Sequence, residues 1–304
     1  DPLLPRHRSD PRLNPGNGWV SPLCHEPRVA LAVLETMLAP HVSAGRLRIL
    51  RQHRPVAVRL RDAAHVASVI VRDAAGTECA LAADYFLDAT ENGDLLPLAE
   101  VEHVTGAESR AQTGEPSAPE QAAPGNSQAF SVCFALEERA GENHVIAVPP
   151  GWERWRSYRP QLTPPWPGPL LSWNAVNPRT MAPIRYNFDP HREAPRAFSG
   201  LWSYRRILDR SQFAPGAYAS DVSLVNWPMI DYMEGDLLTC DETTRQARIE
   251  AARQLSLSMV YWLQTEAPRP DGGKGWPGLR LRGDLLGTAD WLAMAHDRIE
   301  SRRI

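Results

Sequence analysis

The chain has 304 residues, of which 43% are hydrophobic and 23% are charged. These proportions are typical of a globular protein with ample material for a buried core. The formal net charge of −3 argues against a nucleic-acid-binding protein, because no basic excess is present to neutralise phosphates. Lys274 is the only lysine, a skew that indicates biased codon usage rather than a charge-based function.

Cysteines and histidines show no metal-binding spacing. The four cysteines are scattered and the nine histidines are dispersed, so neither a zinc nor an iron–sulfur motif is present and no metal site is predicted. Without a disulfide framework we expect a reduced, cytoplasmic protein. A run of about 18 apolar residues and a charged-then-apolar amino terminus are both absent, so neither a membrane span nor a signal peptide is predicted.

The first regular element predicted is a helix over Glu26–Met37. Its apolar residues recur at helical spacing, and Pro27 suits a first helical turn. Pro40 is expected to limit the continuation of the helix. The apolar positions are Val29, Val33, Leu34 and Met37.

A series of strand-like runs follows this helix. An Asp-Ala-Ala-Gly sequence at 73–76 predicts a hairpin connection between two of them. We therefore expect a small antiparallel meander that is followed by a last apolar strand. The runs are Leu47–Leu50, Val56–Leu60, Val66–Val71 and Tyr85–Leu87.

The middle of the chain alternates loops with one buried strand. Gly106–Gln128 is rich in polar and small residues without an apolar period, which predicts a surface loop. Ala129–Leu136 predicts a buried strand. Residues 149–200 are so dense in proline that neither a regular helix nor a central strand is expected there. This stretch also contains Trp152, Trp155, Trp166 and Trp173.

A long helix is predicted over Glu242–Gln264, with Thr239 and Asp241 as candidate caps. Residues 265–285 return to glycine, proline and arginine and predict a loop. A short helical segment is expected near Asp290–His296. The apolar stripe of the long helix consists of Ala247, Ala251, Leu255, Met259 and Leu263.

The most informative segment lies at residues 84–101, with the sequence DYFLDATENGDLLPLAEV. An apolar run ends at Asp88, and the small residues Ala89 and Thr90 follow. In a doubly wound sheet, ligands lie beyond the carboxyl ends of strands, where small residues let the backbone approach closely. On spacing alone, an ordinary strand–turn connection explains the segment equally well.

Several blocks of the sequence resemble the family of FAD-dependent oxidoreductases, some of whose members are labelled xanthan-lyase-like. The main signature is residues 88–99 (DATENGDLLPLA) followed by 104–109 (VTGAES). Further matching blocks occur in the expected order and span nearly the whole chain: CHEPRVA at 24–30, QAF at 128–130, CFAL at 133–136, LVNWP at 224–228, GDLLGT at 283–288 and ESRRI at 300–304.

The resemblance implies an FAD cofactor and contacts to it. The backbone of Val56 would pair with the edge of the adenine, and the turn at Ala89 and Thr90 would lie beside the flavin nucleotide. Glu91 stands where the broader pattern has glycine. Because a carboxylate facing the pyrophosphate would be repelled, we expect Glu91 to point away or to accept a hydrogen bond from a donor.

Candidates for the catalytic residues are Asn226, Asp231 and Tyr232, which with Trp227 form a polar-aromatic group after an apolar run. They would lie over the flavin ring or in the substrate pocket, or alternatively anchor a loop through hydrogen bonds. Arg302 would neutralise an anionic substrate or the reduced flavin. A solvated helix end that favours cations explains Arg302 equally well.

Two segments that the family carries are not found in this sequence. Residues 14–18 contain two glycines, yet neither a strand before them nor a helix after them is predicted, so they do not form a Gly-x-Gly-x-x-Gly loop. The segment that completes the flavin pocket would follow Ile304. We therefore expect this chain alone to be incomplete, to bind FAD weakly or not at all, and to be inactive.

Together these inferences predict an α/β protein. Residues 16–105 would form part of a Rossmann-like, glutathione-reductase-type FAD-binding domain with a β-meander, and residues 106–304 a mixed α+β substrate-side domain. The expected reaction is hydride transfer between a small organic molecule and flavin N5. Two alternatives are a carbohydrate- or partner-binding module built on the tryptophans, which could stack on sugars, and a flavin-free relative that acts as a scaffold.

Overall fold

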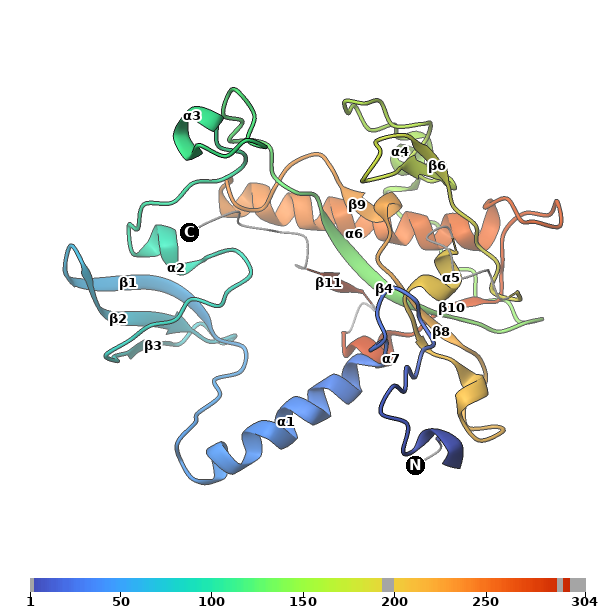
Figure 1. Ribbon diagram of the computed structural model, residues 1–304, viewed down its shortest axis with the longest axis horizontal. Helices are drawn as coiled ribbons and strands as arrows, with labels where there is room; N and C mark the ends of the chain where they lie inside the picture. Colours follow the sequence, from blue (N-terminus) through green and yellow to red (C-terminus); the bar gives the residue numbers. More distant parts are fainter. Residues whose placement is uncertain (1–2, 193–199, 289–291, 296–304) are drawn as a thin grey trace. The chain divides into compact units, whose positions relative to one another are not determined.

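The computed structural model describes residues 3–192, 200–288 and 292–295. The chain divides into two compact units, and the elements of each are drawn in Figure 1. The first unit comprises Asp1–Leu34, Ser131–Glu234 and Gln246–Ala295, and the second comprises Glu35–Phe130, Gly235–Arg245 and the terminal residues. Both contain helices and antiparallel strands, so the chain has a mixed α/β fold.

The first unit is built on a sheet whose strand order is β10-β4-β8-β7. Its central strand is β4, and β11 and β9 also pair with β4. The pairings of β4 with β10, β8 and β11 are antiparallel. The strands are β4 (Phe130–Glu138), β7 (Arg206–Leu208), β8 (Val222–Val225), β9 (Asp231–Tyr232), β10 (Leu279–Leu281) and β11 (Ala293–Ala295).

Strand β4 is buried from its first residue to the eighth, which confirms the buried strand predicted over Ala129–Leu136. The long helix α6 (Glu242–Thr265) confirms the helix predicted over Glu242–Gln264. Its amino terminus is capped by Asp241, whose Oδ1 accepts a hydrogen bond from the Thr244 amide at 2.7 Å. Thr239 instead bonds to Asp236.

Helix α6 lies along the sheet (Figure 1) and is joined to it by polar contacts. The Ser256 hydroxyl donates to the carbonyl of Val132 in β4 at 2.6 Å. The side-chain amide of Gln264 donates through Nε2 to the carbonyl of Leu279 in β10 at 2.7 Å. Because these groups are buried, their hydrogen bonds offset the cost of removing them from water.

Short elements connect these parts of the first unit. In its described part the proline-dense stretch 149–200 contains one six-residue helix and two three-residue strands, because proline lacks a backbone donor. The elements are η1 (Pro5–His7), α4 (Trp152–Ser157), β5 (Asn174–Val176), β6 (Pro183–Arg185), α5 (Leu201–Tyr204), η2 (Arg210–Gln212), η3 (Pro228–Ile230) and α7 (Gly283–Leu286).

Tryptophans from this stretch pack into the interior. Trp173 stacks on Phe188 with ring centroids 5.4 Å apart and meets Trp262 edge-on at 4.8 Å. Trp152, Trp155 and Trp173 are all buried, which leaves no open ring face for a sugar. The burial of three of the four tryptophans therefore removes the main support for a carbohydrate-binding surface.

The second unit contains the antiparallel meander β1-β2-β3. The predicted hairpin at 73–76 is confirmed between β2 and β3: Gly76 has a φ of +89°, and Asp73 Oδ1 accepts from the Thr77 amide at 2.8 Å. The elements are β1 (Arg54–Asp62), β2 (His65–Arg72), β3 (Glu78–Leu81), α2 (Leu95–Leu98) and α3 (Arg110–Thr113).

Helix α1 (Pro27–Ser43) runs through Pro40, so the expected limit at that residue is wrong. Proline cannot donate one intrahelical hydrogen bond. The carbonyl of Pro40 nevertheless accepts a hydrogen bond from the backbone amide of Ala44 at 3.2 Å, so the helical pattern continues past it. Among the described residues α1 buries none of its side chains. Its apolar stripe thus has helical spacing without burial.

Four further predictions of local structure are wrong, and one is the loop over residues 265–285, where β10 and the start of α7 lie. Residues 47–50 and 85–87 form no strand. The third strand of the meander is instead Glu78–Leu81, which pairs with β2 because it directly follows the hairpin turn. Residues 293–295, expected to be helical, form β11 on β4. Short apolar runs do not distinguish helix from strand, and pairing with an open strand decides between them.

The two glycines at residues 16 and 18 have a packing role. A Cβ atom at Gly16 would lie 1.7 Å from the carbonyl oxygen of Arg206. The Gly16 carbonyl also accepts a hydrogen bond from Arg206 Nε at 2.8 Å. The segment is therefore held against β7, and glycine is required there by the close approach of two backbones.

The packing of α6 on β4 predicts a large cost for a cavity at Leu255, which is fully buried. Leu255→Ala is expected to lower the free energy of unfolding by about 2–5 kcal/mol. Leu257→Ala on the same helix, where the side chain is only half-buried, should cost less, about 1 kcal/mol. Urea denaturation measures both variants, and equal losses would contradict this packing.

Candidate functional site

The turn at residues 88–95 in the second unit is fixed by its own side chains. Asp88 Oδ1 accepts hydrogen bonds from the Thr90 amide at 2.9 Å and the Thr90 hydroxyl at 2.7 Å. Asp88 Oδ2 accepts from the Leu95 amide at 3.0 Å. The Thr90 hydroxyl in turn accepts from the Asp94 amide at 2.7 Å. One carboxylate and one hydroxyl thus tie the start of α2 to the preceding chain.

The hydrogen bonds of this network determine the ionisation state of the Asp88 carboxyl. Burial alone would raise the pKa of Asp88, but the hydrogen bonds from Thr90 and Leu95 outweigh it and hold the pKa below its ordinary value. The carboxylate is therefore ionised at neutral pH. It serves the turn internally, as does the Thr90 side chain, so any contact of Thr90 with a ligand would come from its backbone.

Three other residues of the turn are either exposed to solvent or contain an atom without a hydrogen-bond partner. Ala89 and Glu91 are exposed, and Glu91 forms no ion pair with another described residue. The Asn92 Oδ1 atom is buried without a hydrogen-bond partner. A buried acceptor that lacks a donor costs free energy unless a ligand or water supplies one. The turn therefore offers a small exposed side chain next to an acceptor in need of a donor.

Val56 lies at an irregularity of β1. In the β1–β2 ladder Pro55 pairs with Val71 and Ala57 with Ile70, so Val56 is the extra residue of a β-bulge. A bulged residue is left out of the ladder and its backbone is turned from its partner strand. β1 is also the outer strand of the meander. Helix α2 packs against β1 within the same unit.

The polar-aromatic group after β8 belongs to the first unit. Asn226 directly follows β8, Asp231 and Tyr232 form β9, and all three residues are buried. Asp231 Oδ1 accepts a hydrogen bond from the Ser131 hydroxyl of β4 at 2.6 Å. The ring of Tyr232 meets Trp155 edge-on at 6.2 Å. This group is therefore anchored to the central strand.

Burial has a defined effect on Tyr232. Burial makes the larger contribution and the negative charge of the nearby Glu234 a smaller one, and both raise the pKa of the Tyr232 hydroxyl above its ordinary value. Tyr232 is therefore a neutral hydrogen-bond donor over the whole physiological range. The fourth candidate, Arg302, lies outside the described residues.

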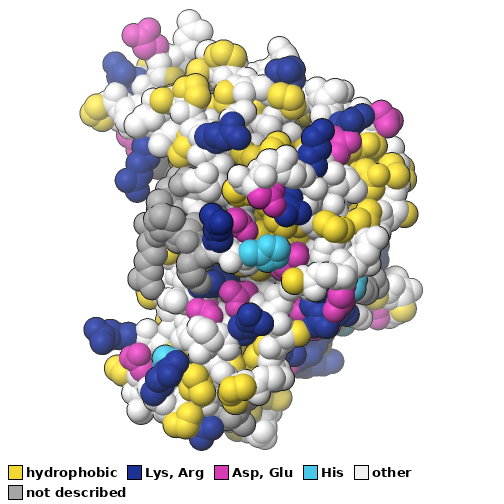
Figure 2. All heavy atoms as spheres, turned by 90° about the vertical axis from the view of Figure 1, so that its right-hand side faces the viewer, with side chains coloured by type: hydrophobic (Ala, Val, Ile, Leu, Met, Phe, Trp, Pro, Cys, Tyr) yellow, Lys and Arg dark blue, Asp and Glu magenta, His cyan; other side chains and the backbone are white. Residues whose placement is uncertain are grey.

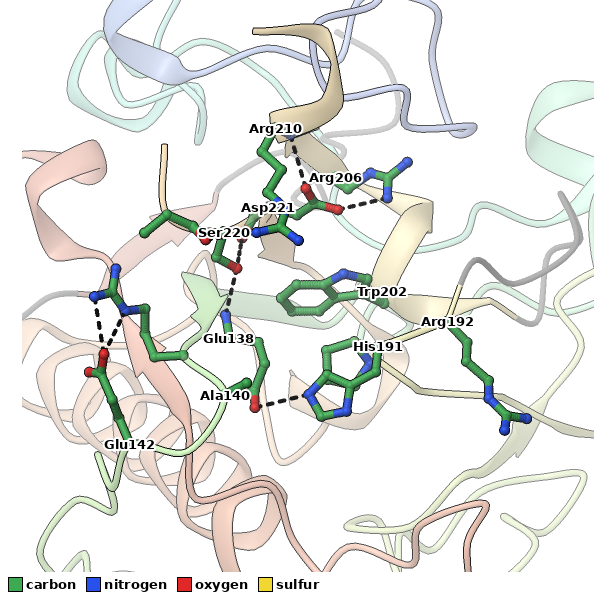
Figure 3. A pocket seen from close by; sticks show the side chains of 13 residues that line it. Glu138, Ala140, Glu142, His191, Arg192, Trp202, Arg206, Arg210, Ser220 and Asp221 are labelled. Carbon is green, nitrogen blue, oxygen red and sulfur yellow. Dashed lines mark hydrogen bonds and ion pairs between the residues drawn. The ribbon is translucent and has the colours of Figure 1, made fainter. Parts of the chain in front are cut away.

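A pocket that the sequence reasoning did not predict lies elsewhere in the first unit. It has a volume of about 570 Å³ and is lined by the end of β4, residues 190–192, α5, β7 and the segment before β8. Two cavities of about 290 and 390 Å³ share His191 with it. Figure 3 shows Glu138, His191, Trp202 and Arg210 around the largest of the three.

Glu138 is the central carboxylate of this pocket. Its side chain is only 8% exposed, and its Oε1 is 3.2 Å from His191 Nε2. Burial raises the pKa of Glu138 above its ordinary value, although the hydrogen bond and charge of His191 act in the opposite direction. The position of Glu138 at the end of a continuous apolar run is visible in the sequence. Its partners in the pocket come from distant segments, so the sequence alone does not identify the pocket.

Charged side chains of both signs are interspersed on the face of the molecule drawn in Figure 2. Among the described residues, no group of three or more histidine, cysteine or acidic side chains could hold a metal ion. Within the same residues, no helix is both long and apolar enough to cross a bilayer. None of the four cysteines forms a disulfide bond within the described residues.

Comparison with known proteins gives one match. A family model described as FAD dependent oxidoreductase matches residues 4–304. No curated protein and no solved structure matches the chain. The matched range contains both the 88–95 turn and the group at 226–232.

The hydrogen bonds of Asp88 predict a pH-dependent turn. Because its pKa is lowered in the folded chain, the stabilisation is complete above the unfolded carboxyl pKa of about 3.9 and is lost as the pH falls through the folded value. Asp88→Asn should accelerate amide exchange at Thr90 and Leu95 about tenfold at neutral pH, with little difference from the native chain at about pH 2. Exposed Asp84→Asn is the control, and exchange unchanged by Asp88→Asn would refute the network.

Proposed function

Because the chain belongs to the family of FAD-dependent oxidoreductases, we propose that it transfers a hydride between a small organic substrate and the N5 atom of FAD. The family match over nearly the whole chain is the observation that carries this proposal. When bound, FAD supplies a two-electron acceptor, while the protein supplies binding, orientation and electrostatics.

The proposed nucleotide contacts are Val56, Ala89, Thr90 and Glu91. The bulge at Val56 supports a backbone contact with the adenine edge, because a bulged residue is available for pairing outside its ladder. At Ala89 the exposed methyl group leaves space for a close approach to the backbone. The buried, unsatisfied Asn92 Oδ1 supports a ligand with hydroxyl donors, as a ribose has.

Thr90 and Glu91 have different proposed roles. Since the Thr90 side chain is engaged with Asp88 and Asp94, it would shape the turn and contact the nucleotide only through its backbone. Glu91 would direct its carboxylate away from the pyrophosphate, because two negative charges at short distance repel. Its exposure is consistent with this orientation.

On the substrate side we propose Asn226, Asp231, Tyr232 and Arg302. The anchoring of Asp231 by Ser131 would fix the position of this group, and Tyr232 would donate a hydrogen bond toward the reacting molecule. Arg302 would neutralise negative charge on the substrate or on reduced flavin. The described members of this group are enclosed, which would keep water from the reacting atoms.

The wider organisation follows from this function. We propose that residues 16–105 form part of a Rossmann-like FAD-binding domain and residues 106–304 the substrate-side domain. The substrate would be a small molecule rather than nucleic acid, and the protein would be cytoplasmic. A flavin-free scaffold is the competing function, which a direct flavin measurement separates from an oxidoreductase.

Titration with FAD of the polypeptide that carries this chain tests the nucleotide contacts, since the chain alone is expected to bind FAD weakly or not at all. Ala89→Trp should weaken FAD binding about tenfold or more, because the indole would occupy the space of the nucleotide. Ala83→Trp, at an exposed alanine of the same unit, should leave the affinity unchanged. The measurement is the quenching of flavin fluorescence. If the polypeptide carrying this chain takes up no flavin on reconstitution, the scaffold function replaces the oxidoreductase.

Tyr232→Phe tests the substrate side. Loss of one hydrogen bond should slow anaerobic reduction of the bound flavin by substrate about tenfold, without a change in FAD affinity. The melting temperature serves as the control for folding. A reduction rate equal to that of the native protein would remove Tyr232 from the reaction.

A further inference from the structure

The pocket at Glu138 contains buried polar atoms that the protein leaves without partners. The Oε2 atom of Glu138 is buried and accepts no hydrogen bond, although its Oε1 contacts His191. The side chain is more than nine-tenths buried. A carboxylate oxygen in this environment costs free energy until a donor reaches it.

Trp202, another residue that lines the same pocket, carries an unsatisfied atom of the opposite polarity. Trp202 in α5 is buried, and its indole Nε1 donates to no acceptor. In Figure 3 its ring lies beside Glu138 and His191. Two residues that line one pocket thus carry a buried acceptor and a buried donor without partners, and hydroxyl groups satisfy both kinds of atom.

Arg210 gives the pocket a cation that is free for a ligand. Its side chain is exposed and donates only to the carbonyl of Ala219, at 3.2 Å. Arg206 is different, since Asp209 and Asp221 neutralise it at 3.3 and 2.9 Å. No described carboxylate forms an ion pair with the Arg210 guanidinium. A guanidinium in this position binds a carboxylate through charge-assisted hydrogen bonds.

We propose that this pocket binds a small hydroxylated carboxylate. The carboxylate group pairs with Arg210, one hydroxyl donates to Glu138, and one accepts from Trp202. A volume of about 570 Å³ accommodates such a molecule. The site lies in the first unit and uses none of the proposed flavin contacts, so it stands independently of the proposed function.

Calorimetric titration of the full chain without FAD tests this site. The ligands are D-gluconate, which has both kinds of group, sorbitol, which has hydroxyls alone, and hexanoate, which has a carboxylate alone. Gluconate should bind at least about tenfold more tightly than either of the others, because it satisfies the charged and the neutral partners together. Added salt should weaken gluconate binding, since a partly exposed ion pair is screened.

Variants locate the binding in the pocket. Arg210→Gln should weaken gluconate binding about tenfold or more, and Trp202→Phe about threefold to tenfold. Arg12→Gln, at an exposed arginine of the same unit outside the pocket, is the matched control. Circular dichroism verifies that each variant is folded, and the exposed Arg210 variant keeps the test decisive if Trp202→Phe does not fold.

Three results would overturn the proposal: no heat of binding with gluconate, equal affinity for gluconate and one of its two analogues, or gluconate binding that Arg210→Gln leaves unchanged. Each is distinguishable from failure of the flavin function, because none of these titrations contains flavin.

Discussion

The burial of strand β4 is the constraint on which the first unit depends. Eight successive residues of β4 are buried, so every polar group on the strand must find a partner within the protein. Ser131 donates to Asp231, and the Val132 carbonyl accepts from Ser256 on α6. Near the other end, Glu137 is paired with Arg282 at 2.8 Å. These contacts orient the surrounding elements around a single strand.

Glu138 is the residue of β4 at which a buried polar atom lacks a hydrogen-bond partner. It directly follows the buried run, and one of its oxygens has a partner while the other has none. A buried and unsatisfied carboxylate oxygen costs free energy until a ligand, an ion or a water molecule supplies a partner. The same strand thus anchors the polar-aromatic group near one end and presents a ligand-binding carboxylate at the other.

The second unit uses a different device to hold a loop in place. There the fixed element is the turn at 88–95, where the Asp88 carboxylate binds the backbone on both sides of the turn. Such side-chain capping makes a loop rigid without burying it. A partly exposed turn that is fixed by its own hydrogen bonds is suited to contact a ligand through its backbone, because little conformational entropy is lost on binding.

Local patterns in the sequence determined the elements whose signal is long or chemically specific. The apolar period of α6, the continuous run of β4 and the Asp73–Gly76 hairpin were each predicted correctly, because periodicity and turn chemistry act over neighbouring residues. The turn that contains Ala89 and Thr90 is indicated by its small residues after an apolar run and by the family resemblance, not by periodicity. Its nucleotide contacts remain predictions.

Tertiary structure alone decided what depends on distant partners. Residues 293–295 became a strand because β4 offered them a pairing edge, and residues 85–87 formed none. The pocket was not predicted because Glu138, His191 and Arg210 come from separate segments, and no spacing along the chain records their proximity. Sequence determines the local conformational preferences, whereas the positions of polar groups relative to one another arise only when the chain has packed.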